Sequence, residues 1–264
     1  MQPISAFPRD AARALLAVAF DIDDTVTCAG VLDSAAYAAM TRLHRAGLVL
    51  VAATGRPLGF AEVFARSWPV DCAVGENGAG LVRRGDSGVV RLYWDAEETR
   101  ADQRRVLERI RARVATELPH IQLASDAWAR RCDLAFDIGE EAHVARSEVD
   151  ALCDLIRSEG AACSVSSIHA HAQLGRHDKA TGIAWALAQC RDISASEAQS
   201  RCLFVGDSGN DAPAFAWFSQ TAGVANVRHH LARLPVPPRY VASATHGAGF
   251  AEIADHLLAM REVP

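Results

Sequence analysis

The most informative stretch of this sequence is LLAVAFDIDDT, residues 15–25. Its first six residues form an unbroken apolar run of strand length, which is typical of a strand buried on both faces of a sheet. Asp21, Asp23 and Asp24 follow directly, where such a strand would end. Open α/β sheets place their ligands at the carboxyl ends of their strands, so the stretch predicts an acidic site at this point. The alternative for this segment alone is a turn or a helix N-cap.

Buried strands and helices alternate on either side of this stretch. After it, the pattern predicts a helix over about Ser34–Ala46 and a second buried strand at Leu48–Ala53. The same alternation returns later, with a helix over about Asp178–Gln189 and a strand at Arg201–Val205. These two regions together predict a Rossmann-like, doubly wound parallel sheet.

The middle of the chain has a different pattern. A long arginine-rich helix is predicted at Glu97–Leu118, and residues 132–138 and 167–173 alternate between apolar and polar side chains. Such alternation is typical of antiparallel strands with one open face. The predicted fold class is therefore α/β, with a core domain at residues 1–94 and 174–264 and a smaller inserted α+β cap domain at 95–173.

The composition narrows the functional classes. The chain has 264 residues and a formal net charge of −5, so no positive excess indicates a nucleic-acid or acidic-membrane partner. No apolar run reaches the ~20 residues that a membrane helix needs. The seven cysteines form no Cys-x-x-Cys pair, which argues against a disulfide framework or a zinc cage and favours a reducing cytoplasm. We expect a monomer or homodimer that binds a small molecule.

Three further segments carry polar groups at strand ends or helix starts. Thr54 and Gly55 precede a helix and can form a small anion cradle, although many strand–helix joints look similar. Lys179, the single lysine among 27 basic residues, begins a predicted helix, where an ammonium group suits a phosphate; a surface lysine is the alternative. Asp207 and Asp211, in GDSGND at residues 206–211, can share a metal with Asp21, unless they only form a turn and an N-cap. Oxygen-only ligands favour Mg²⁺.

The four segments, in this order, resemble the motifs of the haloacid dehalogenase (HAD) superfamily of phosphohydrolases. The match covers Phe20–Thr25, Ala53–Arg56, Lys179 and Gly206–Asp211. Between Thr54 and Lys179 lie 124 residues, far more than one crossover requires. Together with GENGA at residues 75–79, this insertion resembles the type IIB cap group, which includes Cof-like and sucrose-phosphate phosphatases.

This resemblance implies a Mg²⁺-dependent phosphomonoester hydrolase that acts through an aspartyl-phosphate, on a sugar phosphate or a similar small metabolite. Asp21 would be the nucleophile, and Asp23 the general acid and base. The implied Mg²⁺ ligands are Asp21, Asp23, Asp207 and Asp211. The implied phosphate-binding residues are Thr54, Gly55, Lys179 and Asn210. The candidates for substrate specificity are Arg56, Asn77, His169 and His171.

Several alternatives stay open at this point. A phosphomutase of the phosphomannomutase type would use the same core. A non-catalytic phosphate-binding relative is the other alternative, although such relatives usually lose at least one of these residues and all of them are present here. The polar faces of the cap strands are either hydroxyl-binding groups or solvated surface; they carry Asp133, Asp137, His169, His171 and Gln173. The pair His169 and His171 is also compatible with zinc, although strand histidines without nearby cysteines are more often ordinary polar residues.

Overall fold

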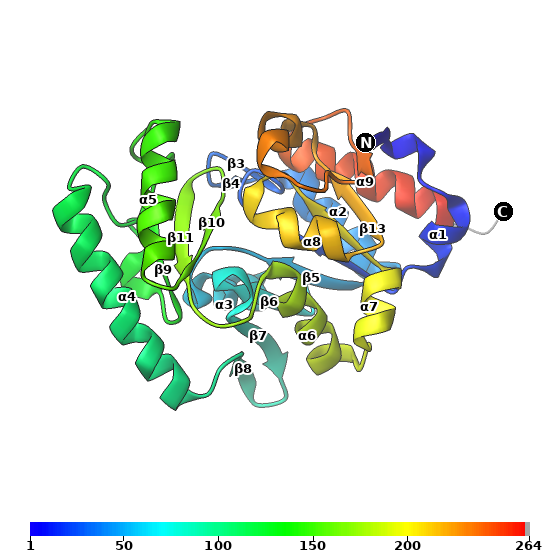
Figure 1. The fold of residues 1–264 in the computed structure, drawn as a ribbon. Coiled ribbons are helices and arrows are strands. Elements are labelled where there is room, and N and C mark those ends of the chain that lie inside the picture. The colour runs from blue at the N-terminus through cyan, green and yellow to red at the C-terminus, as the bar shows by residue number, and fades with distance from the viewer. Residues whose placement is uncertain (262–264) are drawn as a thin grey trace.

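A nine-stranded sheet runs through the larger part of the molecule (Figure 1). The structure, a computed structural model, describes residues 1–261. In spatial order the strands are β1 (Gln2–Pro3), β14 (Tyr240–Val241), β13 (Gln220–Gly223), β12 (Cys202–Gly206), β2 (Ala17–Phe20), β5 (Val49–Ala53), β6 (Cys72–Gly75), β7 (Gly80–Gly85) and β8 (Gly88–Tyr93). In this spatial order, every strand from β1 at one edge through β6 pairs in parallel with its neighbour. The antiparallel hairpin of β7 and β8 follows β6 at the other edge.

Helices cover both faces of this sheet, which confirms the doubly wound core. Val18 and Phe20 of β2 face the first layer, and Ala17 and Ala19 face the second. The first layer consists of α1 (Arg9–Ala14), α2 (Ser34–Arg45), α3 (Leu58–Ser67) and α9 (His246–Arg261). The second consists of α6 (Lys179–Arg191), α7 (Ala195–Arg201) and α8 (Ala212–Trp217). Because β2 is buried on both sides, charged groups at its end must be paired with opposite charges, hydrogen bonds or a cation in the same place.

A smaller cap lies beside the core (Figure 1). Its elements are α4 (Glu97–Glu117), β9 (Asp133–Asp137), α5 (Arg146–Ser158), β10 (Ala162–Val165) and β11 (His169–Gln173). The three strands form an antiparallel sheet in the order β10-β11-β9. Ile110 and Leu152 from the two helices pack on Phe136 and Ala170 of this sheet, so the cap has its own hydrophobic core. The α+β cap is thus confirmed, while the limits 95–173 stay a prediction.

The expectation of an open polar face on the cap sheet is wrong. The side chains of that face are all buried: Asp133, Asp137, His169, His171 and Gln173. Alternation shows that a strand has one polar face, but it does not show what covers that face. Here the cap helices cover the apolar face, and the polar face meets charged groups of the core and the cap.

Several short elements were not predicted from the sequence. They are the hairpin β3 (Thr27–Cys28) and β4 (Val31–Leu32), the strands β1, β10, β13 and β14, the helices α1 and α7, and the 3-10 turns Ile4–Ala6, Glu76–Gly78, Ala127–Ala129 and Ala225–Arg233. Elements this short depend on tertiary contacts rather than on a local pattern. Within residues 1–261, no helix has both the length and the hydropathy that would be needed to cross a membrane.

Candidate active site

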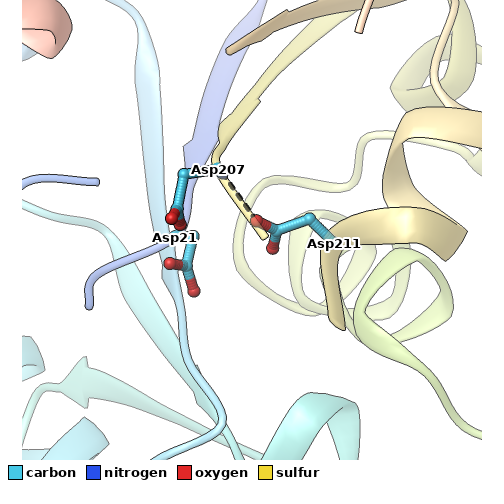
Figure 2. A group of neighbouring side chains, drawn as sticks. All are labelled: Asp21, Asp207 and Asp211. Carbon is cyan, nitrogen blue, oxygen red and sulfur yellow. Dashed lines mark hydrogen bonds between the residues drawn. The ribbon is translucent and has the colours of Figure 1, made fainter. Parts of the chain in front are cut away.

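Three buried carboxylates meet at the carboxyl ends of β2 and β12 (Figure 2). Asp21 follows β2, Asp207 follows β12, and Asp211 lies in the next turn. One carboxylate oxygen from each lies within 4.8 Å of the other two. Asp211 Oδ2 also accepts hydrogen bonds from the backbone N–H groups of Asp207 (2.8 Å) and Ser208 (3.0 Å), which fixes the turn.

Lys179 joins this cluster from the first turn of α6. Its Nζ lies 2.6 Å from Asp21 Oδ1 and 2.6 Å from Asp211 Oδ1, and its side chain is fully buried. The start of α6 is fixed by a close approach to Gly78, whose φ is +110°, because a Cβ there would lie only 2.2 Å from the carbonyl oxygen of Asp178. Glycine at position 78 therefore helps to place the lysine that faces the carboxylates.

Three carboxyl groups share this cluster with one ammonium group, so its fully ionised form would carry an excess of negative charge. Burial raises the pKa of Asp21 to about 8, and repulsion from Asp211 and Asp23 adds to it while Lys179 opposes it. Burial also raises the pKa of Asp207 well above its ordinary value. For Lys179, burial opposes the charge, but Asp21 and Asp211 outweigh it and raise its pKa. Such a site favours the binding of a further cation.

The donor set fits a hard divalent cation. Asp211 already uses both carboxylate oxygens, toward Lys179 and two backbone N–H groups, so it is placed behind Asp21 and Asp207. Thr25 Oγ1 bridges those two, at 3.3 Å from Asp21 Oδ2 and 3.1 Å from Asp207 Oδ1, which leaves further lone pairs on each carboxylate. Oxygen donors of this kind suit Mg²⁺. Within residues 1–261 no other group of three acidic, histidine or cysteine side chains is close enough to hold a metal.

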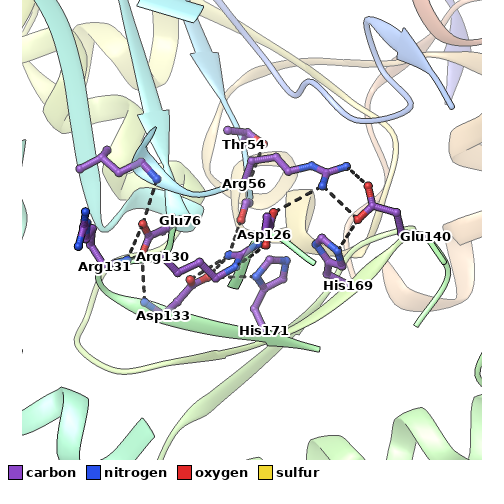
Figure 3. Close-up of polar contacts among 12 residues, drawn as sticks. Thr54, Arg56, Glu76, Asp126, Arg130, Arg131, Asp133, Glu140, His169 and His171 are labelled. Carbon is purple, nitrogen blue, oxygen red and sulfur yellow. Dashed lines mark hydrogen bonds and ion pairs between the residues drawn. The ribbon is translucent and has the colours of Figure 1, made fainter. Parts of the chain in front are cut away.

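Asp23 lies nearby but is bound to Arg56. The guanidinium of Arg56 approaches Asp23 Oδ1 through Nε at 3.1 Å and Nη2 at 3.0 Å, and Oδ2 through Nε at 3.2 Å. Arg56 also binds Glu140 of the cap at 2.7 and 3.1 Å and approaches Asp126 at 3.5 Å (Figure 3). Both oxygens of Asp23 are thus engaged, and Arg56 connects the core to the cap.

Two of the predicted phosphate-binding residues, Thr54 and Asn210, lie near Gly55. Thr54 Oγ1 accepts a hydrogen bond from Arg56 N at 2.9 Å. A Cβ on Gly55 would lie 3.0 Å from the ring of His171 and 3.2 Å from Asn77 Nδ2, so glycine allows the core to approach the cap here. Asn210 Nδ2 donates to Asn77 Oδ1 at 3.1 Å. Asn77 Nδ2 is buried without a hydrogen-bond partner among the described residues, which leaves it free to bind a substrate oxygen.

The cap covers this region with a second buried network (Figure 3). His171 Nδ1 lies 3.1 Å from Asp133 Oδ2, and Arg130 binds Asp133 at 2.9 Å, Asp126 at 2.9 Å and the carbonyl oxygen of Gly55 at 2.9 Å. Burial lowers the pKa of His171 to about 4, so its imidazole is neutral at pH 7. Although burial opposes it, Arg130 and His171 lower the pKa of Asp133 to about 2. These charges are already paired and fix the cap against Gly55.

The other cap histidine completes the connection between cap and core. His169 Nε2 lies 2.9 Å from Glu140 Oε2, and Glu140 in turn binds Arg56. The hydrogen bond from His169, assisted by Arg56, lowers the pKa of Glu140 to about 2. The four side chains Asp23, Arg56, Glu140 and His169 therefore form one chain of charged contacts across the domain boundary. We call this chain the Arg56 bridge.

Two polar side chains of the cap sheet do not reach the site. Asp137 accepts hydrogen bonds from four successive backbone N–H groups, those of residues 139–142, and so holds the turn after β9. Gln173 accepts from Ser164 on the adjacent strand. As hydroxyl-binding candidates for a substrate, both stay predictions.

The space at the site is divided by Arg56. A chamber of about 10 Å³ is enclosed between the catalytic-site candidates and the cap, and its lining includes Asp21, Gly55, His169 and His171. That volume is about that of one water. A larger cavity of about 620 Å³ opens on the other side of Arg56 and Asp23, lined by aromatic rings and the carboxylates of Asp126 and Glu140. A molecule larger than a water can therefore enter the chamber only if the cap or Arg56 moves.

Sequence reasoning missed several residues of the site. Nothing in the sequence marks Arg130 among 26 arginines, although it is buried and binds both domains. Glu140 and Asp126 lie in predicted loops of the cap, and their role depends on how the cap meets the core. Asn226, whose Nδ2 donates to Asp207 Oδ2 at 3.0 Å, follows β13, so only its position after a strand could have indicated it.

No model of a known protein family matches this sequence, and no curated protein matches it. Solved structures do match. A protein of Thermoplasma acidophilum has a TM-score of 0.71 and 18% identity, over 92% of this chain and 98% of that one. The sucrose-phosphatase of Synechocystis sp., solved with sucrose and phosphate, has a TM-score of 0.67 and 19% identity, over 93% and 98%. A Plasmodium vivax protein described as a HAD/COF-like hydrolase has a TM-score of 0.66 and 17% identity, over 96% and 100%. The predicted resemblance is thus confirmed for the fold: this chain has the fold of the HAD/COF-like hydrolases and of sucrose-phosphatase.

Proposed function

We propose that this protein is a Mg²⁺-dependent phosphomonoester hydrolase that works through an aspartyl-phosphate. The observation that carries the proposal is the buried group of Asp21, Asp207 and Asp211, with Lys179 in contact with two of them, at the ends of two parallel strands. The fold shared with sucrose-phosphatase supports the same reaction class. Phosphoryl transfer needs a nucleophile and positive charge around the transferred group; Asp21 is the proposed nucleophile, and Lys179 with a bound cation would supply the charge.

In the first step, Asp21 attacks phosphorus, so that a bond forms from its carboxylate oxygen and the bond to the leaving oxygen breaks. Asp23 delivers a proton to the leaving alkoxide. Asp23 then takes a proton from a water, which attacks phosphorus and releases phosphate from Asp21. Lys179, Thr54 and Asn210 neutralise or bind the phosphoryl oxygens. Mg²⁺, held by the carboxylates of Asp21 and Asp207 and the backbone carbonyl of Asp23, would supply further charge neutralisation.

The Arg56 bridge must open in this scheme. Arg56 engages both oxygens of Asp23, and we expect it to turn away when Asp23 acts on a leaving group. Arg56 then becomes available to bind the substrate, and Glu140 and His169 are released with the cap. This role keeps Arg56, Asn77, His169 and His171 as candidates for substrate contacts.

The substrate we propose is a sugar phosphate or a similar small metabolite. Carboxylates and aromatic rings line the cavity of about 620 Å³ next to Asp23, and this combination suits a leaving group with hydroxyl groups and apolar faces. The sucrose-phosphatase with the same fold was solved with sucrose and phosphate. The cytoplasmic location and a monomeric or homodimeric state stay predictions from the sequence.

Phosphate release from a panel of sugar phosphates and other phosphomonoesters, with Mg²⁺ and with EDTA, tests this function. We expect Mg²⁺-dependent release from one or a few compounds. Asp21→Asn should reduce turnover by more than about a thousandfold while the circular dichroism spectrum stays unchanged. A near-normal rate in that variant would contradict the role of Asp21 as nucleophile. A folded wild-type protein that releases no phosphate from any member would contradict the reaction class.

A further inference from the structure

A second cavity, of about 750 Å³, lies between α3 and β8 of the core and α4 of the cap. Its lining does not include Asp21, Asp23, Lys179 or the other carboxylates of the acidic cluster. Its walls combine aromatic and aliphatic side chains with arginines from both domains. The apolar side chains are Leu58, Phe60, Val63, Tyr93 and Trp128. The volume lies within the range of known small-molecule sites.

The charged lining of this cavity is positive. It contains four arginines and two glutamates, a formal charge of +2 in a chain whose net charge is −5. The arginines are Arg91 of the core and Arg100, Arg104 and Arg131 of the cap. One part of α4 thus lines the cavity through Arg100 and Arg104, whereas Arg105, with 77% of its side chain exposed, lies outside it.

Arg91 is paired with Glu62, but the other three arginines retain capacity to bind an anion. Arg100 and Arg104 share the single carboxylate of Glu97, and Arg104 Nη2 lies 2.7 Å from it. The guanidinium carbon of Arg100 lies 3.7 Å above the ring of Tyr93, and Arg100 Nε is buried without a hydrogen-bond partner among the described residues. The guanidinium of Arg131 forms no ion pair with residues 1–261. A planar, charged group of this kind binds phosphate oxygens in pairs.

The cavity is held in shape by a buried carboxylate. Glu76 accepts hydrogen bonds from Leu58 N (3.0 Å) and Arg131 N (3.0 Å), so one side chain connects a core wall of the cavity to a cap wall. The turn that carries Trp128 is fixed by the Arg130–Asp126 pair at 2.9 Å. Trp128 nevertheless has 82% of its surface exposed, which places an indole ring at the rim of the cavity with little to cover it.

We propose that this cavity is a second binding site for an organic anion, namely a phosphate or sulfonate group on a flat aromatic body. The arginines bind the anionic group, and Tyr93, Phe60 and Trp128 contact the flat body. Phe60, Val63 and Trp128 also line the cavity beside Asp23, so a ligand here reaches the wall of the substrate site. The ligand is then either a separate effector or the far end of an extended substrate.

Fluorescence titration with 8-anilinonaphthalene-1-sulfonate tests the site without turnover. This probe is an aromatic anion but not a phosphomonoester, so its binding does not depend on the proposed hydrolase activity. We expect one saturable site per chain, and a Kd at least about fivefold higher in Arg131→Ala and in Arg104→Ala. The matched control is Arg111→Ala, on the same helix, since Arg111 pairs with Glu108 and lies outside the cavity. Wild-type affinity in both cavity variants, or an equal loss in Arg111→Ala, would overturn the proposal.

Competition and kinetics then identify the anion and its source. In EDTA, adenosine 5′-monophosphate should displace the probe and adenosine should not; equal displacement by both overturns the requirement for an anion. With p-nitrophenyl phosphate as substrate, competitive inhibition by the probe indicates that the cavity holds the far end of a substrate. A change in kcat at constant KM indicates a separate effector. Both effects should be lost in Arg131→Ala, and their persistence there would overturn the assignment of the site.

Discussion

At the scale of single residues, Glu76 shows how a buried charge can connect two domains. Its carboxylate is completely buried, and it accepts hydrogen bonds from the backbone N–H groups of Leu58 in the core and of Arg131, Cys132 and Asp133 in the cap. Its own φ is +48°, in the left-handed region. A non-glycine residue adopts that conformation only where surrounding contacts hold it. Here the four donors supply them.

The pKa of Glu76 leads to a prediction about pH. Burial, with repulsion from Asp133, raises this pKa from 4.5 to about 7. The folded protein then binds the proton more tightly than the unfolded chain, so this group's contribution to stability is complete below pH 4.5 and is lost as the pH rises through about 7. We expect wild type to lose about 1–3 kcal/mol more than Glu76→Gln between pH 5 and pH 8, from denaturant unfolding at both values. Parallel pH profiles for the two proteins would show that Glu76 does not titrate in this range.

At the scale of elements, the cap and core are joined by paired charges rather than by a shared apolar core. The apolar clusters of the cap and of the two core faces are separate. Across the boundary, Arg56 binds Glu140, and Arg130 binds the carbonyl oxygen of Gly55. Contacts of this kind can break and form again without exposing a hydrophobic interface, which suits a cap that has to open.

The Arg56 bridge gives the next prediction. Glu140→Ala removes both hydrogen bonds from Arg56 across the boundary, together with the contact to His169 within the cap; 12% of the Arg56 side chain and 27% of the Glu140 side chain are exposed. A loss of about 1–2 kcal/mol shifts the closed–open equilibrium about tenfold toward open. We expect a larger radius of gyration by X-ray scattering and faster hydrogen exchange at residues 54–56. Glu141→Ala, one residue further along, is the control and should leave both unchanged. A compact Glu140→Ala variant with unchanged exchange would exclude the bridge as a latch.

These elements also show how far the sequence alone could lead. The alternation of strands and helices predicted the doubly wound core, and the strand-end rule placed Asp21 and Asp207 at one edge, where the structure brings them together with Lys179. Residues whose partners lie on another domain were not predictable in this way. Glu76 was only part of a glycine-rich turn, and the partners of Arg130 depend on where the cap packs. Local patterns give the elements and the ends of strands, but not the packing of one domain on another.

At the scale of the whole molecule, the site stores unfavourable charge that only the folded chain brings together. Asp21 and Asp207 both have raised pKa values because burial and neighbouring carboxylates disfavour their charged forms. In the unfolded chain these groups are solvated and far apart. At neutral pH the cluster therefore lowers the free energy of unfolding of the metal-free protein. A cation that binds only the folded state raises it again.

Mg²⁺ should accordingly stabilise the protein in a way that depends on Asp207. At a concentration of about 100 times Kd, a ligand specific for the folded state adds about 2.7 kcal/mol, which corresponds to roughly 5–10 °C in Tm for a chain of this size. We expect this rise in a thermal scan of wild type on exchange of EDTA for Mg²⁺, and its loss in Asp207→Asn. Asp24→Asn is the matched control, because Asp24 lies beside the cluster in sequence but outside it in space, and its φ of +58° is one that asparagine tolerates. An equal rise in Tm in Asp207→Asn would show that Mg²⁺ binds elsewhere, because the carboxylates at the ends of β2 and β12 would then not be the groups whose charge it neutralises.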